Sequence, residues 1–191
     1  LLHPEICSPN HLSQEEIREL IAYAEKFYLE IIPDIDTPGH VRQLLTHHLE
    51  WCLPKTDGSR ETSALDILNP EAVDFIKEIY QEFAELFQES RYFHIGADEF
   101  VDFDQLDQYP SLTSTALKLG STASGINPFI QYVNDLIHYL NGSGFTVRVW
   151  NDGFYRNDDQ EHIHLTNQCE VSYWTRWNPH KAAIETYLTR G

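Results

Sequence analysis

The apolar and polar positions of the chain follow two alternating periods. Four stretches place apolar residues three or four positions apart, which predicts amphipathic helices over 13–27, 69–87, 127–140 and 178–188. Four short apolar runs between them predict buried strands over 29–33, 92–96, 145–150 and 170–174. Loops are expected over 34–40 and 102–125. Helices that alternate with short buried strands are typical of an α/β fold with a parallel sheet.

Residues at the ends of these helices support the assignment. Ser13 and Glu16 have the spacing of a capping box, in which each side chain bonds the other's backbone N–H. Asn69 precedes Pro70, a pair suited to a cap and a first helical turn, and the later helices repeat the same Asn-Pro start. A Gly-Ser-Gly stretch predicts the end of the third helix.

Composition limits the class of protein. A chain of 191 residues with 41% hydrophobic residues is long enough for one domain with a substantial core, and we expect a single domain over 1–191. The net charge of −17 argues against nucleic-acid binding, and the sequence has no apolar run long enough to span a membrane. The three cysteines do not have the spacing of a disulfide framework or a zinc site, so we expect neither a metal nor a cofactor. The absence of methionine suggests part of a longer product, and we assign no compartment.

Two α/β architectures fit this order of elements, a doubly wound sheet and a (β/α)8 barrel. The nucleotide-binding type of doubly wound sheet has a glycine-rich phosphate loop, and no predicted strand here is followed by one. Polar and aromatic residues follow the strands instead, as on the active rim of a barrel. They are Asp34, Asp36 and His40, then Asp98 and Glu99, then Trp150, Asn151 and Asp152, and finally Trp174. A whole barrel needs eight strands and about 250 residues, so four strands predict the middle part of a barrel.

The stretch RYFHIGADEF ends a predicted strand with two adjacent acids, Asp98 and Glu99. Neighbouring residues of an extended chain point in different directions. The two carboxylates therefore cannot easily lie on opposite faces of a sugar as acid and nucleophile, about 5–5.5 Å apart. A different division of roles between the two acids fits better, in which one acid protonates the leaving oxygen and the other orients a group of the substrate.

Four motifs in order, IIPDIDTPGH, HIGADEF, VRVWNDGF and VSYW, carry a resemblance over essentially the whole chain. Together they resemble the glycoside hydrolase family 20 β-N-acetylhexosaminidases, most closely the single-domain, dispersin-like members. The resemblance implies a (β/α)8 barrel of which this chain holds roughly strands 3 to 6. Two positions depart from the family pattern, since Asp34 stands where Glu is usual and Ala97 where Gly is frequent.

The resemblance also implies a mechanism, a substrate and a set of roles. The substrate's own acetamido oxygen attacks the anomeric carbon and forms an oxazolinium ion, which water then opens with net retention. Asp98 would hold the acetamido N–H and Glu99 would act as general acid and then base. Trp150 and Trp174 would form walls of the acetamido pocket. Asp36 and His40 would support Asp98, and Asp152 would sit near the rim.

Three functions remain open from the sequence. The first is removal of terminal β-linked N-acetylglucosamine or N-acetylgalactosamine from oligo- or polysaccharides. The second is release of a disaccharide, as by a lacto-N-biosidase, and the third is carbohydrate binding without turnover. The presence of both acids argues against the third, because binding alone needs no general acid. We interpret His94 as a core histidine and assign no role to Trp51 or Trp177.

Overall fold

A four-stranded parallel sheet forms the centre of the structure, a computed structural model that describes residues 2–157, 162–177 and 179–190. Its strands are β1 (Asp34–Thr37), β4 (Tyr92–Gly96), β5 (Thr146–Trp150) and β6 (Cys169–Ser172). They lie side by side in that order, and each neighbouring pair is parallel.

The order of the parallel strands in space is the same as their order along the chain. A doubly wound sheet reverses its strand order at a switch point, whereas a barrel adds each strand beside the one before it. The sheet is therefore an arc of a (β/α)8 barrel, as expected. The barrel is not closed by the described residues, since β1 and β6 each pair on one side only.

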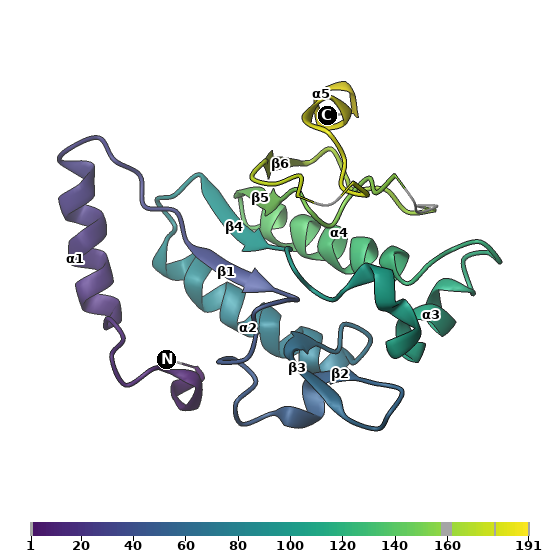
Figure 1. Cartoon of the computed structure of the whole chain (residues 1–191). Coiled ribbons are helices and arrows are strands. Elements are labelled where there is room, and N and C mark those ends of the chain that lie inside the picture. The colour runs from purple at the N-terminus through teal and green to yellow at the C-terminus, as the bar shows by residue number, and fades with distance from the viewer. Residues whose placement is uncertain (1, 158–161, 178, 191) are drawn as a thin grey trace.

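Helices α2 (Pro70–Leu86) and α4 (Ile126–Gly142) pack against each other and lie along the sheet (Figure 1). Along β4 and β5 every second residue is fully buried, including Phe93, Ile95 and Val149. These side chains belong to one continuous core with apolar residues of both helices. The residues between them point to the opposite face, which is the inner face of the arc.

The remaining elements surround this core. They are helices α1 (Gln14–Glu25), α3 (Pro110–Ala116) and α5 (Ile184–Arg190), the antiparallel pair β2 (Cys52–Pro54) and β3 (Arg60–Leu65), and 3-10 turns at Pro4–Ile6, Leu49–Trp51 and Phe103–Gln108. Within the described part of the chain, no helix has the length and apolar character needed to cross a membrane.

The predicted caps of the first two helices are confirmed. The backbone N–H of Glu16 donates to Ser13 Oγ at 3.2 Å, while the Glu16 carboxylate accepts from the Ser13 N–H at 2.7 Å. Asn69 accepts from the backbone N–H of Glu71 at 3.0 Å. The start of the third helix was placed one residue late, because Asn127 lies inside its first turn. Its side chain instead accepts backbone N–H groups of the segment that follows β5.

Four element assignments differ from the sequence prediction. The first strand is 34–37 and not 29–33, because the alternating acids of DIDT line an interior polar site and so resemble a solvated loop in sequence. The region 102–125 contains a 3-10 turn and α3, which is too short to show a clear period. The antiparallel pair β2–β3 was not foreseen. The last helix was predicted over 178–188, but it begins at Ile184. The described residues 179–183 before it are not helical, and this segment instead carries Lys181 to the carboxylate of Asp152. Position 178 itself lies outside the described residues.

Candidate active site

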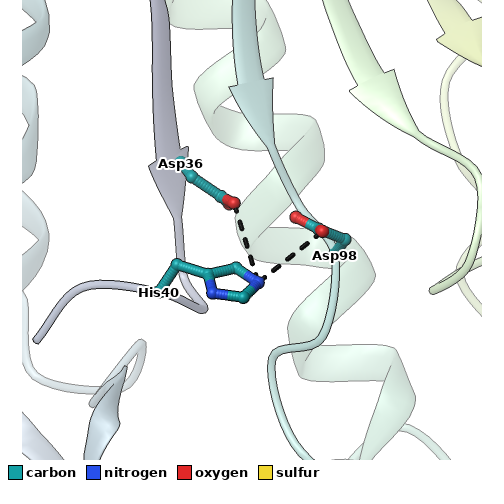
Figure 2. A group of neighbouring side chains, drawn as sticks. All are labelled: Asp36, His40 and Asp98. Carbon is teal, nitrogen blue, oxygen red and sulfur yellow. Dashed lines mark ion pairs between the residues drawn. The ribbon is translucent and has the colours of Figure 1, made fainter.

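His40 contacts three carboxylates at the end of the sheet. Its Nε2 atom lies 3.4 Å from Glu99 Oε2, 3.6 Å from Asp98 Oδ2 and 3.9 Å from Asp36 Oδ2. Figure 2 shows the imidazole, which follows β1, pointing between Asp36 at the end of β1 and Asp98 after β4. Parallel strands end at the same edge of a sheet, so the fold brings these sequence-distant groups together.

Burial separates the two adjacent acids. Asp98 is only 9% exposed, and its Oδ1 atom is buried with no hydrogen-bond partner among the described residues. The side chain of Glu99 is 45% exposed. A buried oxygen that accepts no hydrogen bond is costly unless a ligand supplies a donor. Asp98 therefore offers an acceptor inside the site, and Glu99 offers a carboxyl at its opening.

The carboxyl of Asp36 also has a buried oxygen without a hydrogen-bond partner in the described structure. Burial raises the pKa of Asp36 to about 9, and the neighbouring carboxylates of Asp98 and Asp34 act in the same direction. At neutral pH this carboxyl is therefore protonated. The protonated carboxyl of Asp36 can donate to Asp98, and a hydrogen bond between these two side chains contributes to the raised pKa of Asp36.

The turn after β4 has an unusual backbone that aims the acids. Gly96, Ala97 and Glu99 all have positive φ, at 71°, 66° and 43°. A side chain at Gly96 would place its Cβ 1.8 Å from Asp36 Oδ1, so only glycine allows Asp36 to pack there. Left-handed residues other than glycine are uncommon and concentrate at functional sites. The turn directs Asp98 inward and Glu99 outward.

Two tryptophans lie beside the acids. Trp150 ends β5 and Trp174 follows β6, with ring centroids 6.2 Å apart and planes inclined at 65°. Trp150 also packs at 4.5 Å against His94 on the inner face of β4. Trp174 remains 44% exposed. The pair presents apolar ring surface at the same edge of the sheet as Asp98 and Glu99.

Asp152 is buried and supports its neighbours. Its Oδ1 accepts from the indole N–H of Trp174 at 3.0 Å. Its Oδ2 accepts from the backbone N–H of Glu99 and from Lys181 Nζ, each at 3.3 Å. Asp152 was predicted as a substrate-binding residue near the rim, and its contacts here are with the residues that surround the site.

His94 has the contacts of a neutral core residue. Its Nδ1 accepts from the Gly96 N–H at 3.1 Å, so Nε2 carries the proton and donates to Ser172 Oγ at 3.2 Å. Burial, with Arg148 nearby, lowers the pKa of His94 to about 4. The histidine therefore orders the end of β4 and is uncharged at neutral pH.

Two residues without a predicted role lie at the site. Trp177 packs at 4.6 Å against Trp174, and Lys181 places its ammonium 4.0 Å from the Trp177 ring centroid. The spacing of two tryptophans three residues apart was the only sequence signal for Trp177. Nothing in the sequence pattern distinguished Lys181 from a solvated lysine.

Asp36, His40 and Asp98 are also the residues with the geometry to hold a metal ion. One ligand atom from each lies within 4.8 Å of the others, the one grouping of this kind found in the described part of the chain. Carboxylate and imidazole ligands suit several divalent cations. Of these three residues, the chemistry developed below assigns Asp98 to the substrate and His40 to the support of Glu99, and it routes no step through a metal.

Comparison with known proteins agrees with this geometry. The sequence model of the glycosyl hydrolase family 20 catalytic domain matches residues 5–191. A lacto-N-biosidase of Bifidobacterium bifidum is 30% identical over 166 residues, which are 86% of this chain and 15% of that protein.

Two solved structures resemble the fold over nearly the whole chain. A catalytic module of the pneumococcal exo-β-D-N-acetylglucosaminidase StrH has a TM-score of 0.73 and 26% identity, covering 96% of this chain and 45% of that one. Dispersin B has a TM-score of 0.69 and 23% identity, covering 94% and 51%. The chain thus spans about half or less of the length of each of these three proteins.

Proposed function

The chain belongs to glycosyl hydrolase family 20, and we propose that its protein removes terminal β-linked N-acetylhexosamine by substrate-assisted hydrolysis. The observation that carries this proposal is the pairing of a buried Asp98, whose Oδ1 lacks a donor, with an exposed Glu99 beside it. The family and its fold are established by the match to residues 5–191. The activity and substrate of the whole protein are the proposal.

The position of the two carboxylates argues against a nucleophile supplied by the protein. Asp98 and Glu99 both lie within 3.6 Å of the same nitrogen, Nε2 of His40. The two acids are adjacent in the chain and both contact the His40 imidazole, whereas a retaining acid–nucleophile pair must flank the sugar. The attacking atom must then come from the substrate, and the 2-acetamido oxygen is within reach of the anomeric carbon.

Asp98 has the properties required of the group that receives the acetamido N–H. Its free buried oxygen would accept that N–H, which leaves the acetamido carbonyl oxygen directed at the anomeric carbon. Positive charge develops on the acetamido group as the oxazolinium ring closes, and a carboxylate already in place stabilises it. Trp150 and Trp174 would enclose the methyl group, since aromatic faces suit apolar groups that must be held in one orientation.

Glu99 would move the proton in both steps. In the first step the acetamido oxygen forms a bond to the anomeric carbon, the glycosidic C–O bond breaks, and Glu99 gives its proton to the leaving oxygen. In the second step Glu99 takes a proton from water as that water opens the ring and restores the acetamido group. The product keeps the β configuration. His40, 3.4 Å from Glu99, would orient its carboxyl between the steps.

Disaccharide release is the second candidate, because the lacto-N-biosidase relative matches 86% of this chain. The two activities require the same acids and differ in the space beyond the terminal sugar. Carbohydrate binding without turnover is less favoured, since Glu99 is exposed at the opening of the site where a general acid would be needed.

The proposal is tested by identifying the products that the protein containing this chain releases from glycoside substrates. We expect a nitrophenyl β-N-acetylglucosaminide to release monosaccharide, whose first-formed anomer in the NMR spectrum is β. Cleavage of a nitrophenyl lacto-N-bioside alone would favour the second candidate. A first-formed α anomer would contradict the mechanism, and binding without any product would favour the third function.

A further inference from the structure

The imidazole of His40 lies between two carboxyls at distances that are too long for hydrogen bonds. Its Nε2 atom is 3.6 Å from Asp98 Oδ2 and 3.9 Å from Asp36 Oδ2, whereas a hydrogen bond spans about 2.7–3.2 Å. One ligand atom from each of the three side chains lies within 4.8 Å of the others. Figure 2 shows the nitrogen directed at the space between the two carboxyls. A small cation would fit at the point that these atoms share.

We propose that Asp36, His40 and Asp98 bind a divalent cation of the zinc type in the free protein, and that this ion excludes the substrate. Binding of the ion depends only on residues of this chain. The competition with substrate rests on the proposed function, in which Asp98 receives the acetamido N–H. The ion is therefore an inhibitor of the proposed reaction and not a cofactor.

The distances and the ligand types favour zinc. Bonds of about 2.0–2.2 Å place neighbouring ligand atoms of a tetrahedral zinc site about 3.3–3.6 Å apart. The separation between His40 and Asp98 falls in this range, and the separation between His40 and Asp36 is slightly longer. Octahedral Mg²⁺, with bonds of about 2.0–2.1 Å, needs neighbouring ligands about 2.9 Å apart. Mg²⁺ and Ca²⁺ also prefer oxygen ligands, whereas imidazole is a common ligand of zinc.

The carboxyls of the site lack other partners. Asp98 is more than nine-tenths buried, and Oδ1 of Asp98 and Oδ1 of Asp36 are buried without a hydrogen-bond partner in the described structure. Among the described residues, neither carboxyl has a lysine or arginine within ion-pair distance, and both pair with His40. Buried carboxylates usually pair with a cation or coordinate a metal. Without metal Asp36 keeps a proton, which a bound ion would displace.

The loop after β1 fixes His40 against the turn that carries Asp98. A Cβ at Gly39 would lie 2.5 Å from the backbone oxygen of Asp98, so the close approach of the two segments requires glycine there. His40 has a φ of 56°, a left-handed conformation that is uncommon for residues other than glycine. Its side chain is still 46% exposed, so an ion can reach Nε2 from solvent. Ligands that are already in place lose little conformational freedom when the ion binds.

Calorimetric titration with Zn²⁺ of the protein that contains this chain tests the binding. We expect one ion that His40→Gln and Asp36→Asn each bind at least about tenfold more weakly, because each substitution removes a ligand. The exposed His47→Gln is the matched control and should bind this ion as the wild type does. Mg²⁺ should bind to the wild type at least about tenfold more weakly than Zn²⁺.

Kinetics with a nitrophenyl β-N-acetylglucosaminide test the competition. Added Zn²⁺ should raise KM without lowering kcat, because saturating substrate displaces the ion from Asp98. A chelator should restore the original KM.

Each other outcome has a distinct meaning. Unchanged Zn²⁺ binding in His40→Gln and Asp36→Asn would show that the ion binds elsewhere, and would overturn the site. Equal affinity for Mg²⁺ would overturn the class of ion. A fall in kcat at unchanged KM would overturn the competition with substrate. Weaker Zn²⁺ binding in both variants, without turnover of any N-acetylglucosamine substrate by the wild type, would support the site and remove the proposed function.

Discussion

The indole N–H of Trp174 donates to Oδ1 of Asp152 at 3.0 Å, which links the aromatic wall after β6 to the loop after β5. The other oxygen of Asp152 accepts from the backbone N–H of Glu99 and from Lys181. A single buried carboxylate therefore connects three strand ends. The positions of Glu99 and Trp174 depend on one another through it.

The Asp152→Asn variant should lose stability as well as activity. Asparagine can still accept from Trp174, but it leaves the ammonium of Lys181 buried without a negative partner. Removing one member of a buried ion pair costs about 3–5 kcal/mol, and we expect a loss in that range in the free energy of unfolding. Chemical denaturation of the purified protein measures it.

The matched control for this prediction is the double variant Asp152→Asn, Lys181→Met, which removes the stranded charge while keeping the apolar stem. It should recover more than half of the stability lost by Asp152→Asn alone. Additive losses from the two substitutions would show that Asp152 and Lys181 are not coupled as described.

Glu99→Gln tests the proton transfer. Glutamine keeps the size of the side chain but cannot protonate the leaving oxygen. We expect kcat/KM for an unactivated oligosaccharide to fall about 100-fold to 10,000-fold, and for a nitrophenyl glycoside much less, because nitrophenolate leaves without protonation. The exposed and distant Glu89→Gln should leave both values unchanged. Equal losses on the two substrates would count against the role of Glu99.

Gly96→Ala tests the packing of Asp36 on the turn after β4. Gly96 and Gly58 both have positive φ, at 71° and 83°, but nothing lies within 4 Å of a Cβ at Gly58. Gly58→Ala should therefore cost only the left-handed strain, about 1–2 kcal/mol, without changing kcat/KM. Gly96→Ala adds the collision with Asp36 and should lower kcat/KM at least about tenfold as well. Identical behaviour of the two variants would show that Asp36 need not sit where it does.

Asp36 makes stability depend on pH. Its pKa is raised to about 9 in the folded protein, above the unfolded value of about 3.8, mainly by burial. The folded state thus holds a proton that the unfolded state releases. The stability that this proton contributes is fully present below about pH 4 and is lost as the pH rises to about 9. Asp36→Asn cannot titrate and should flatten that decline by up to about 1.4 kcal/mol per pH unit. Unfolding curves between pH 4 and 9 check this, with the exposed Asp107→Asn as control, and an unchanged slope would contradict it.

The sequence predicted the parts of the fold in which one pattern dominates. Strands 92–96 and 145–150 were placed because their buried face is apolar throughout. The first strand was misplaced because Asp34 and Asp36 point into a polar site, and the pattern of such a strand resembles a turn. Apolar periodicity identifies residues that pack against the apolar core, and it does not identify residues that are buried beside charged groups.

The candidate site was predicted where residues follow strands directly. Asp98, Glu99 and Trp150 do so, and parallel strands end at one edge. The contact of His40 with Glu99 and the packing of Trp177 against Trp174 could not be predicted, because each depends on the path of a loop. Lys181 is a similar case, since its burial comes from a carboxylate 29 positions away in the chain.

The central claim is that the substrate supplies the nucleophile while Asp98 orients it. The most direct test replaces the N-acetyl group of an aryl β-glycoside by mono-, di- and trifluoroacetyl groups in the protein that contains this chain. Fluorine withdraws electrons from the carbonyl oxygen and weakens it as a nucleophile without adding much bulk. We predict that kcat falls steeply and in order along the series, because stabilisation by Asp98 acts only on the transition state in which that oxygen bonds to carbon. A flat series, or a sugar covalently attached to Asp98 or Glu99, would contradict the claim.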